Sequence, residues 1–328
     1  MNAGRVTFVT GATGFLGSRL ARALLERGDR LRCLVRDPRR AAALEAAGAE
    51  LIPGDVTDPV AMEHGCRDAE LACHLAAVYD LGVVDSALIE RVNVDGTAEF
   101  LRAARTAAVP RTLYVSTTGA LGPVEEGAGD EMSSWQGPFP SLYHRTKTRA
   151  HQLARAAQDA GDPVVIVCPA AVYGPGDHGP GGRFLLDIVR GRLPGFLSDP
   201  ATFSYVHVDD AVAGLLAAAD RGRAGATYVF SGDVLTINEF GTRAARLAGR
   251  KPPRLRFPTS LALATGALLD ALSRSTGHRF TMSRESVRVS AGYRWVHSHD
   301  LATRELDWHP RSVDEGLPGT VEWVKRLA

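Results

Sequence analysis

The chain has 328 residues, of which 45% are apolar and 23% are charged, as in ordinary globular proteins. Lysine and arginine (38) nearly balance aspartate and glutamate (37), so no overall charge would attract nucleic acid or an anionic membrane, and neither is expected as a partner. The length exceeds that of most single cores and predicts two domains, or one domain with a large lobe.

The first half of the chain alternates between strand-like and helix-like segments. Strands are predicted at residues 5–11, 30–37, 49–58, 70–78, 111–119 and 162–174. Helices are predicted at residues 14–28, 38–48, 85–108 and 141–161. Apolar strands that alternate with helices are typical of a doubly wound parallel sheet, so we predict an α/β fold of the Rossmann class.

After about Pro169 this alternation ends. A Gly- and Pro-rich loop is followed by a predicted helix (183–194), a strand (203–208), a second helix (209–222) and a second strand (226–232). Asp209 or Asp210 is expected to cap the second helix. The remainder is predicted to be mainly helical. We therefore predict a dinucleotide-binding domain over residues 1–168, with 205–232 returning to it, and a smaller, mostly helical substrate lobe over residues 169–328.

The cysteines and the apolar segments bear on where in the cell the protein is located. The four cysteines, Cys33, Cys66, Cys73 and Cys168, have no Cys-x-x-Cys spacing, which predicts buried free thiols. The N-terminal segment has no long apolar run, so no signal peptide is expected and a cytoplasmic location is predicted. The apolar stretch 261–272 is too short to cross a bilayer and is expected to be a buried or interfacial helix.

Three glycines, Gly11, Gly14 and Gly17, stand between the first predicted strand and the first predicted helix, in the stretch VTGATGFLGS. Glycine permits a tight turn, and the first N–H groups of a helix can bind a pyrophosphate. The spacing is Gly-x-x-Gly-x-x-Gly, not the Gly-x-Gly-x-x-Gly of the standard fingerprint. This context indicates a dinucleotide site, with a ligand-free turn as the alternative.

The end of the second predicted strand bears on the choice of cofactor. A basic residue there favours the 2′-phosphate of NADP(H), whereas an acidic residue accepts a hydrogen bond from the 2′-hydroxyl of NAD(H). Arg36 comes first and Asp37 follows. We interpret Arg36 as the phosphate partner and favour NADP(H) over NAD(H). Asp37 keeps NAD(H) open, and a solvated charge run is a further alternative.

Tyr143 and Lys147 lie four residues apart on a predicted helix, and therefore on one face. A lysine ammonium near a phenol lowers the pKa of the phenol and prepares it for proton transfer. The preceding strand ends with Ser116 and Thr117, at the edge where a doubly wound sheet binds its ligands. We predict that one of these hydroxyls contacts a substrate oxygen.

No metal site is predicted. His144 and His151 are seven residues apart, His178 lies in a loop, and none has a carboxylate or cysteine at a ligand spacing. His207 is expected to be structural.

Several further segments make the chain resemble an extended short-chain dehydrogenase/reductase of the NAD-dependent epimerase/dehydratase superfamily over essentially its whole length. They are TGATGFLG, GDVTD (54–58), HLAA (74–77), VNVDGT (92–97), YHRTK (143–147), PAAVYGPGD (169–177) and YVHVDDAV (205–212). Residues 33–38 and 302–323 resemble the dihydroflavonol-reductase-like and hydroxysteroid-dehydrogenase-like branch.

The resemblance implies a role for each candidate residue. Tyr143 would exchange a proton with the substrate oxygen, Lys147 would lower its pKa and hold the nicotinamide ribose, and Thr117 would contact that oxygen, with Ser116 as the alternative. Asn93 would support the cofactor through a hydrogen-bond network. The residues expected to bind the cofactor are Gly11, Thr13, Gly14, Phe15, Leu16, Gly17, Arg36, Asp55, Val56, Ala76, Ala77, Asn93, Pro169 and Val172.

Two departures from relatives are visible. Cys168 stands before Pro169 where many relatives have arginine, and Thr118 and Gly119 replace the Asp-Glu pair of sugar-nucleotide 4,6-dehydratases. The second departure argues against a dehydratase, because water elimination needs that added acid and base. The resemblance further suggests a homodimer built on two long helices near residues 88–106 and 143–159, with a monomer as the alternative.

We therefore predict an NADPH-dependent reductase of a ketone or aldehyde on a small metabolite, reversible as an alcohol dehydrogenase. Two alternatives remain, a sugar-nucleotide epimerase and a non-catalytic NADP-binding regulator. Arg183 and Arg190 are the basic candidates for a nucleotide diphosphate in the lobe. An apolar or ring-containing substrate is suggested by five aromatic residues, each of which could equally belong to the core: Trp135, Phe139, Tyr173, Phe184 and Phe196.

Overall fold

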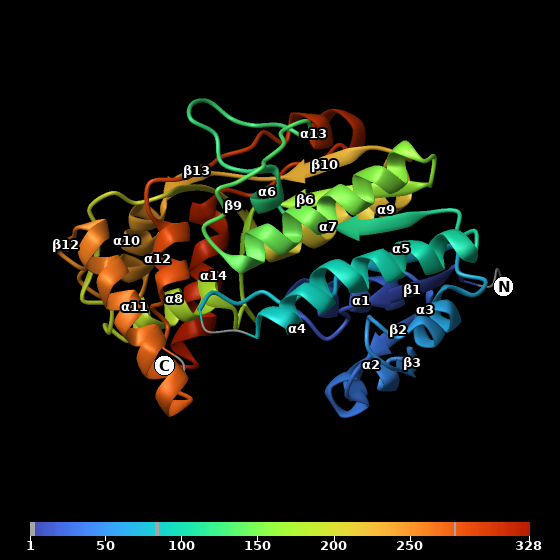
Figure 1. Ribbon diagram of the computed structural model, residues 1–328, viewed down its shortest axis with the longest axis horizontal. Helices are drawn as coiled ribbons and strands as arrows, with labels where there is room; N and C mark the ends of the chain where they lie inside the picture. The colour runs from blue at the N-terminus through green and yellow to red at the C-terminus, as the bar shows by residue number, and fades with distance from the viewer. Residues whose placement is uncertain (1–3, 83–84, 279) are drawn as a thin grey trace.

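A seven-stranded parallel sheet forms the centre of the computed structural model, which describes residues 4–82, 85–278 and 280–328 (Figure 1). The strand order is β10 (Thr227–Phe230), β6 (Val164–Pro169), β5 (Thr112–Val115), β4 (Leu71–His74), β1 (Val6–Thr10), β2 (Arg30–Val35) and β3 (Glu50–Pro53). Every neighbouring pair is parallel. The predicted Rossmann-class α/β fold is confirmed.

Helices cover both faces of this sheet. The helices α1 (Phe15–Glu26), α9 (Val208–Arg221) and α13 (Asp300–Leu306) form one layer, while α3 (Pro59–Cys66), α5 (Gly96–Thr106) and α7 (Leu142–Asp159) form the other. Phe8 packs into the second layer and its neighbour Val9 into the first, and both are fully buried. Burial on both faces explains why these strands are almost continuously apolar. All four cysteines are buried and free, as predicted.

Several predicted elements of the first half are divided differently in the structure. The predicted helix 38–48 is a 3-10 turn, η1 (Pro38–Ala41), followed by α2 (Ala42–Ala46). The predicted helix 85–108 comprises α4 (Ser86–Glu90), a π-helical turn, η2 (Arg91–Asp95), and α5. Helix α3 was not predicted from the sequence, although Asp58 caps it by accepting from the Val60 and Ala61 N–H groups.

The predicted strand 162–174 is wrong as a single strand. The chain leaves the main sheet after Pro169, and β7 (Ala171–Tyr173) pairs with β9 (Thr202–His207) in a smaller sheet. That sheet also contains β11 (Val234–Thr236) and β13 (Arg294–Trp295). The predicted cap of α9 is wrong too, because His207 occupies the N-cap position and its side chain accepts from the Asp209 N–H at 3.3 Å.

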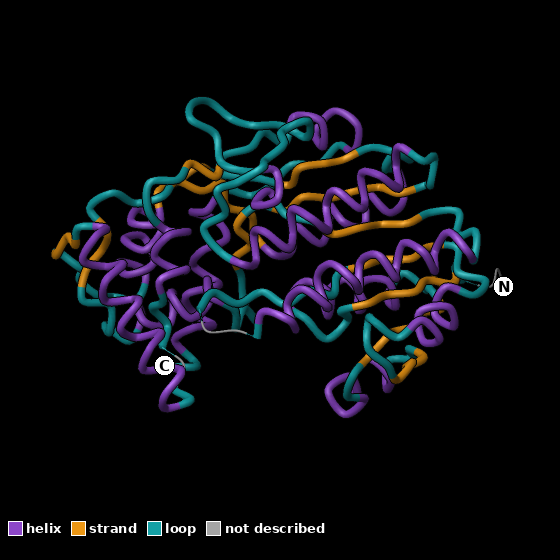
Figure 2. Tube along the Cα trace, viewed as in Figure 1, coloured by secondary structure: helices purple, strands orange, loops and turns teal. Residues whose placement is uncertain are grey.

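The rest of the chain builds a smaller, mostly helical lobe, as predicted. Its core lies between α8 (Pro180–Val189), α10 (Ile237–Leu247) and α14 (Val313–Lys325). A two-stranded sheet of β8 (Gly195–Leu197) and β12 (Leu255–Phe257) adjoins this core. Helix α11 (Thr259–Thr276) lies at the outer edge of the lobe and packs on α12 (Arg284–Ser290). Figure 2 shows that helices make up most of the lobe. No described helix combines the length and apolarity needed to cross a membrane. The predicted domain boundaries remain predictions.

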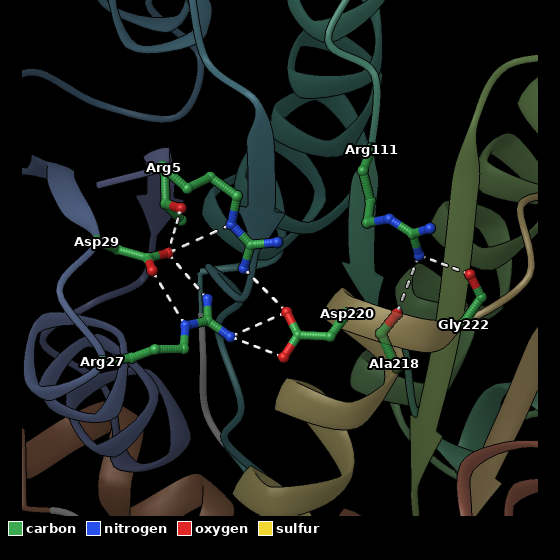
Figure 3. A network of polar contacts seen from close by, with 8 residues as sticks. Arg5, Arg27, Asp29, Arg111, Ala218, Asp220 and Gly222 are labelled. Atoms are coloured by element: carbon green, nitrogen blue, oxygen red, sulfur yellow. Dashed lines mark hydrogen bonds and ion pairs between the residues drawn. The ribbon is translucent and has the colours of Figure 1, made fainter. Parts of the chain in front are cut away.

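An ion-pair network fastens α9 to the first strand and helix (Figure 3). Asp220, at the end of α9, pairs with Arg5 at 3.1 Å and with Arg27 at 2.9 Å. Asp29 bridges the same two arginines, at 3.5 Å and 2.9 Å. Asp29 is mostly shielded from solvent, and it holds the two arginines that also bind Asp220. The network therefore connects α9, which comes late in the chain, to the first strand and helix.

Candidate active site

The glycine turn between β1 and α1 approaches the end of β4 closely. Gly11 has a φ of +77°, and a Cβ there would lie 2.6 Å from the Ala76 amide nitrogen. A Cβ on Gly17 would lie 2.0 Å from the Gly11 carbonyl oxygen. Both positions therefore require glycine for the turn itself.

The open side of this turn suits an anion. Gly14 is the N-cap of α1, and no side chain caps this helix end. Thr13 and Gly14 are exposed, and Phe15 and Leu16 are partly exposed. The first N–H groups of α1 thus remain available, and the turn fits the pyrophosphate of a dinucleotide.

The two charged residues after β2 have different surroundings. Asp37 caps η1 by accepting from the Arg39 N–H at 3.1 Å, and it also pairs with the Arg39 guanidinium at 2.9 Å. Arg36 is exposed, and none of the described carboxylates forms an ion pair with it. Asp37 is therefore already occupied, whereas Arg36 is available to a ligand.

The remaining residues predicted around the cofactor lie at the ends of β3, β4 and β6. Asp55 accepts from the Thr57 N–H and hydroxyl, and Val56 is buried against Gly96. Ala76 and Ala77 follow β4 and are partly or fully exposed. Pro169 ends β6 and Val172 lies in β7.

Asn93 lies in the π-helical turn and is almost completely buried. Its side chain accepts from the Val78 N–H at 2.7 Å and donates to the Val78 carbonyl at 3.1 Å. It also donates to the Thr146 hydroxyl at 3.0 Å. Asn93 therefore positions the segment that follows Ala76 and Ala77 against α7.

The Thr117 hydroxyl lies near the Tyr143 phenol and favours its ionised form. Thr117 lies at the carboxyl end of β5 and caps the short helix α6 (Thr118–Leu121) through the Gly119 N–H. Tyr143 lies in the first turn of α7, whose N-cap is Ser141. Both side chains are half-buried, so the end of β5 and the start of α7 bring a hydroxyl and a phenol together.

Lys147 is buried one turn further along α7. Its ammonium donates to the Val115 carbonyl at 2.9 Å and to the Tyr114 hydroxyl at 3.2 Å. Burial lowers the pKa of Lys147 to about 8. Burial also raises the pKa of Tyr143 to about 12, against the opposing effect of the nearby Thr117 hydroxyl. In this arrangement Lys147 contacts β5 and desolvation of the phenol dominates the pKa of Tyr143. The role expected of Lys147 stays a prediction.

The alternative hydroxyl, Ser116, is engaged elsewhere. It is buried, and its Oγ lies 2.9 Å from Nδ1 of His151. The residues after Thr117 are Thr118 and Gly119, neither of which is an acid or a base. Among the described residues, no group of three or more His, Cys, Asp or Glu side chains could hold a metal ion.

Aromatic side chains surround the start of α7. Tyr79 lies 4.5 Å from Tyr143 between ring centroids, and His144 lies 4.8 Å from Trp295. Trp135 contacts both Phe139 and Trp295. Of the five aromatic residues suggested by the sequence, Trp135 and Phe139 therefore lie beside the candidate site, whereas the other three belong to or pack against the lobe core: Tyr173, Phe184 and Phe196.

The two basic candidates of the lobe both have partners within the protein. Arg183 pairs with Asp80 at 2.8 Å, and Arg190 donates to the Leu327 carbonyl at 2.7 Å. These contacts give each arginine a structural role, which weakens the case for a diphosphate site built on them.

A hydrogen-bond chain that was not predicted from the sequence lies beneath the glycine turn. The Thr10 hydroxyl lies 2.8 Å from Nδ1 of His74, whose Nε2 lies 3.3 Å from the Thr97 hydroxyl. Thr97 in turn donates to the Asn93 carbonyl at 2.7 Å. Burial lowers the pKa of His74 to about 3, so its ring is neutral and one nitrogen accepts while the other donates. The motif HLAA contains His74, but its partners are distant in sequence.

A protein-family model matches residues 7–230 of the chain, the part that contains the glycine turn, Thr117, Tyr143 and Lys147. The family model is described as the NAD dependent epimerase/dehydratase family. The chain belongs to this family. The resemblance to extended short-chain dehydrogenases/reductases is thereby confirmed, as is the prediction of an NAD(P)-dependent oxidoreductase at this general level.

Individual relatives cover nearly the whole chain. Sterol demethylase protein B of Methylococcus capsulatus (strain ATCC 33009 / NCIMB 11132 / Bath) is 34% identical over 97% of this chain and 98% of its own. Ceramide reductase of Caulobacter vibrioides (strain NA1000 / CB15N) is 33% identical over 98% of this chain and 94% of its own. The crystal structure of gox2253 has a TM-score of 0.82 at 31% identity and covers 99% of both chains.

Proposed function

We propose that this protein is an NADPH-dependent reductase of a ketone or aldehyde on a small, apolar or ring-containing molecule, reversible as an alcohol dehydrogenase. The observation that carries the proposal is that the Thr117 hydroxyl, at the carboxyl end of β5, and the Tyr143 phenol, in the first turn of α7, come together at this edge of the sheet. This edge also bears the uncapped end of α1, which suits a dinucleotide.

The nicotinamide, when bound, supplies the hydride. The protein supplies orientation and a proton. Thr117 and Tyr143 together would hydrogen-bond the carbonyl oxygen of the substrate, and Tyr143 would donate its phenolic proton as that oxygen becomes an alcohol. The raised pKa keeps this phenol protonated at neutral pH, the form that a reduction needs. Lys147 places a cation beside the end of β5, where it can hydrogen-bond the ribose of the cofactor.

Two observations support NADPH and an apolar substrate. Arg36 is available to a 2′-phosphate while Asp37 is held by Arg39. Tyr79 packs against Tyr143, and Trp135, which contacts Phe139, packs against the neighbouring His144. The names of the ceramide reductase and the sterol demethylase protein point in the same direction, because both contain the name of a largely apolar lipid.

The alternative within this fold is a sugar-nucleotide epimerase. It is less supported, because Arg183 and Arg190 are engaged by the protein's own groups. An epimerase would hold NAD(H) through its cycle, so bound cofactor after purification and no net redox turnover would favour it. A non-catalytic NADP-binding regulator would bind cofactor without turning over any carbonyl.

The proposal is tested by Tyr143→Phe. Wild-type protein should oxidise NADPH in the presence of aromatic or lipid-like ketones, and the variant should lose about 10²–10⁴-fold in kcat, the usual contribution of a general acid. Its Kd for NADPH should stay within a few-fold, which separates loss of chemistry from loss of fold. Turnover that survives within a few-fold on the true substrate refutes the assignment of Tyr143.

We further propose a homodimer built on α4, α5 and α7. Leu88 on α4 and Leu153 on α7 are each 36% exposed. Because α7 packs against both α4 and α5, these elements form one continuous surface that a second copy could cover. A monomer is the alternative.

A further inference from the structure

The helix α11 exposes an apolar face. Six of its residues, at helical spacing on one side, are all exposed and none is charged: Leu261, Ala264, Thr265, Leu268, Ala271 and Leu272. The exposed fractions of Leu261, Leu268 and Leu272 are 53%, 61% and 41%. Surface helices of globular proteins usually present charged and polar residues to water, so this pattern is inverted. Of the two expectations for this stretch, a buried or an interfacial helix, the structure excludes the buried one.

Packing explains which face is turned inward. Only Ala262 and Gly266 of α11 are buried, and α11 packs chiefly on α12. A Cβ on Gly266 would lie 2.7 Å from the Arg284 amide nitrogen, so the two helices meet at a small-residue contact. Figure 1 shows α11 at the outer edge of the lobe, away from the main sheet. The leucines are therefore not needed for the core. From Leu261 to Leu272 they extend about 17 Å along the helix.

The region around α11 is strongly basic. Residues 250–288 contain eight lysines or arginines and two acidic residues, whereas the net charge of the whole chain is +1. Both acids are held by backbone groups: Asp270 accepts from the Arg284 N–H, and Glu285 accepts from the Leu142 N–H. The near-neutral total therefore conceals a local cationic surface. Exposed members include Lys251, Arg254, Arg274, Arg284 and Arg288.

Further apolar side chains flank this face. Leu255 in β12, just before α11, is 59% exposed, and Phe280, after its end, is 36% exposed. An exposed apolar helical face bordered by lysine and arginine is the pattern of a helix that lies in a membrane interface, with its leucines among the acyl chains and its cations at the headgroups.

We infer that α11 is a peripheral docking surface for an anionic phospholipid bilayer. Charge complementarity favours this occupant over a second copy of the chain, whose α11 would bring the same cations together. The sequence-based expectation of no membrane partner rested on the net charge, which averages out this local surface. The inference does not depend on the proposed reaction.

The helix on which α11 packs, α12, contacts the segments of the candidate active site. In α12, the Glu285 carboxylate accepts from the Leu142 N–H at 3.0 Å, one residue before Tyr143. The Ser283 hydroxyl, at the cap of α12, donates to the Leu81 carbonyl at 3.1 Å, in the segment after β4. Helix α12 therefore links the docking surface on α11 to the elements that carry Tyr79 and Tyr143.

The test is co-sedimentation of the full-length protein with vesicles of phosphatidylcholine alone or mixed with phosphatidylglycerol. We expect binding to the mixed vesicles that weakens as salt is raised. The triple variant Leu261→Ser, Leu268→Ser, Leu272→Ser should reduce partitioning about tenfold or more. The triple variant Lys251→Gln, Arg254→Gln, Arg274→Gln should reduce it by a similar factor on the mixed vesicles only.

The matched control is Val60→Ser, which removes a 76% exposed apolar side chain from α3 on a different element. It should leave partitioning unchanged. Far-UV circular dichroism and melting temperature establish that each variant is folded. No binding to either vesicle type at low salt, or binding that survives the leucine variant, overturns the inference. A wild-type oligomer that the leucine variant converts to monomer also overturns it, because a second copy would then cover α11.

Discussion

The side-chain amide of Asn93 donates a hydrogen bond to the Thr146 hydroxyl at 3.0 Å and so joins the π-helical turn to α7 one residue before Lys147. The same side chain hydrogen-bonds both the backbone N–H and the backbone carbonyl of Val78. One buried residue thereby sets the position of the segment after β4 relative to the helix that carries Tyr143. Extra turns of π-helix are often found at functional sites.

Replacing Asn93 by alanine should disturb this arrangement. The Val78 N–H and carbonyl would lose their partner, and we expect a loss of about 1–3 kcal/mol in unfolding free energy. The Kd for NADPH should rise about tenfold through misplacement of Ala76 and Ala77. Urea unfolding and fluorescence titration measure the two effects. Asp95→Ala, at an exposed position in the same turn, is the control, and equal behaviour of the two variants would contradict the role of Asn93.

Thr117 and Ser116 should differ sharply when each is changed to alanine. Thr117→Ala removes the hydroxyl that contacts Tyr143 and should lower kcat about 10²-fold. Thr117→Ser should retain most activity, because it keeps both the hydroxyl and the cap of α6. Ser116→Ala should change kcat only a few-fold, since Ser116 is bonded to His151. The reverse ranking in steady-state assays would identify Ser116 as the substrate-binding hydroxyl.

Removing the charge of Arg36 should affect only the phosphorylated cofactor. For Arg36→Ala we expect the Kd for NADPH to rise about 10–100-fold, which corresponds to the loss of a charge-assisted hydrogen bond, while the Kd for NADH is unchanged. Isothermal titration with both cofactors measures this difference. Arg40→Ala removes an exposed charge nearby and serves as control. Tighter binding of NADH than NADPH by the wild-type protein would refute the preference.

Acid should destabilise the protein through its buried histidines. Burial lowers the pKa to about 3 in His74 and His144 and to about 4 in His151 and His297. Below pH 6.5 the unfolded chain takes up protons that these folded rings do not bind, so stability is lost as pH falls from 6.5 towards 4.

Each such histidine contributes about 1.4 kcal/mol per pH unit in that range. His151→Asn should reduce the slope of unfolding free energy against pH by about this amount, whereas His309→Asn, at an exposed position, should not. Urea titrations between neutral pH and pH 5 measure the slopes. A stability that does not change with pH would show that these rings are charged in the folded state.

The proposed dimer is tested by Leu153→Glu. A carboxylate at a 36% exposed position of α7 should prevent close packing of two copies and yield monomers at micromolar concentration. Size-exclusion chromatography with light scattering measures the mass. Val60→Glu on α3 should leave the mass unchanged. A monomeric wild-type protein, or a dimer unaffected by Leu153→Glu, would exclude this surface.

The sequence was most informative where a functional feature consists of residues that are close together in the chain. The glycine turn and the Tyr143–Lys147 pair involve residues that are close in the chain, so their geometry follows from one turn or one helix. The His74 chain and the partners of Asn93 were missed because they join residues that only the folded sheet brings together. The role of Asp37 was ambiguous for a related reason: only the 3-10 turn shows that Arg39 already occupies it.

The pKa of Tyr143 could not be predicted from its spacing to Lys147. An i,i+4 pair can point at different partners, and here the lysine is drawn to the Val115 carbonyl. Likewise the local charge around α11 was invisible in a total that sums to +1. The first property depends on the contacts that the lysine makes in the fold, and the second on how charge is distributed along the chain. Neither can be obtained from residue spacing or total charge.

The main sheet is finished late in the chain. Its outer strand β10 pairs with β6, yet β7, α8, β8, β9 and α9 lie between them in the chain. During synthesis, the outer edge of β6 therefore stays unpaired until Thr227–Phe230 has left the ribosome. A fragment that stops near residue 168 would keep this edge and would lack Asp220, the partner of Arg5 and Arg27. Such a fragment should aggregate on expression, although it contains the glycine turn, Tyr143 and Lys147.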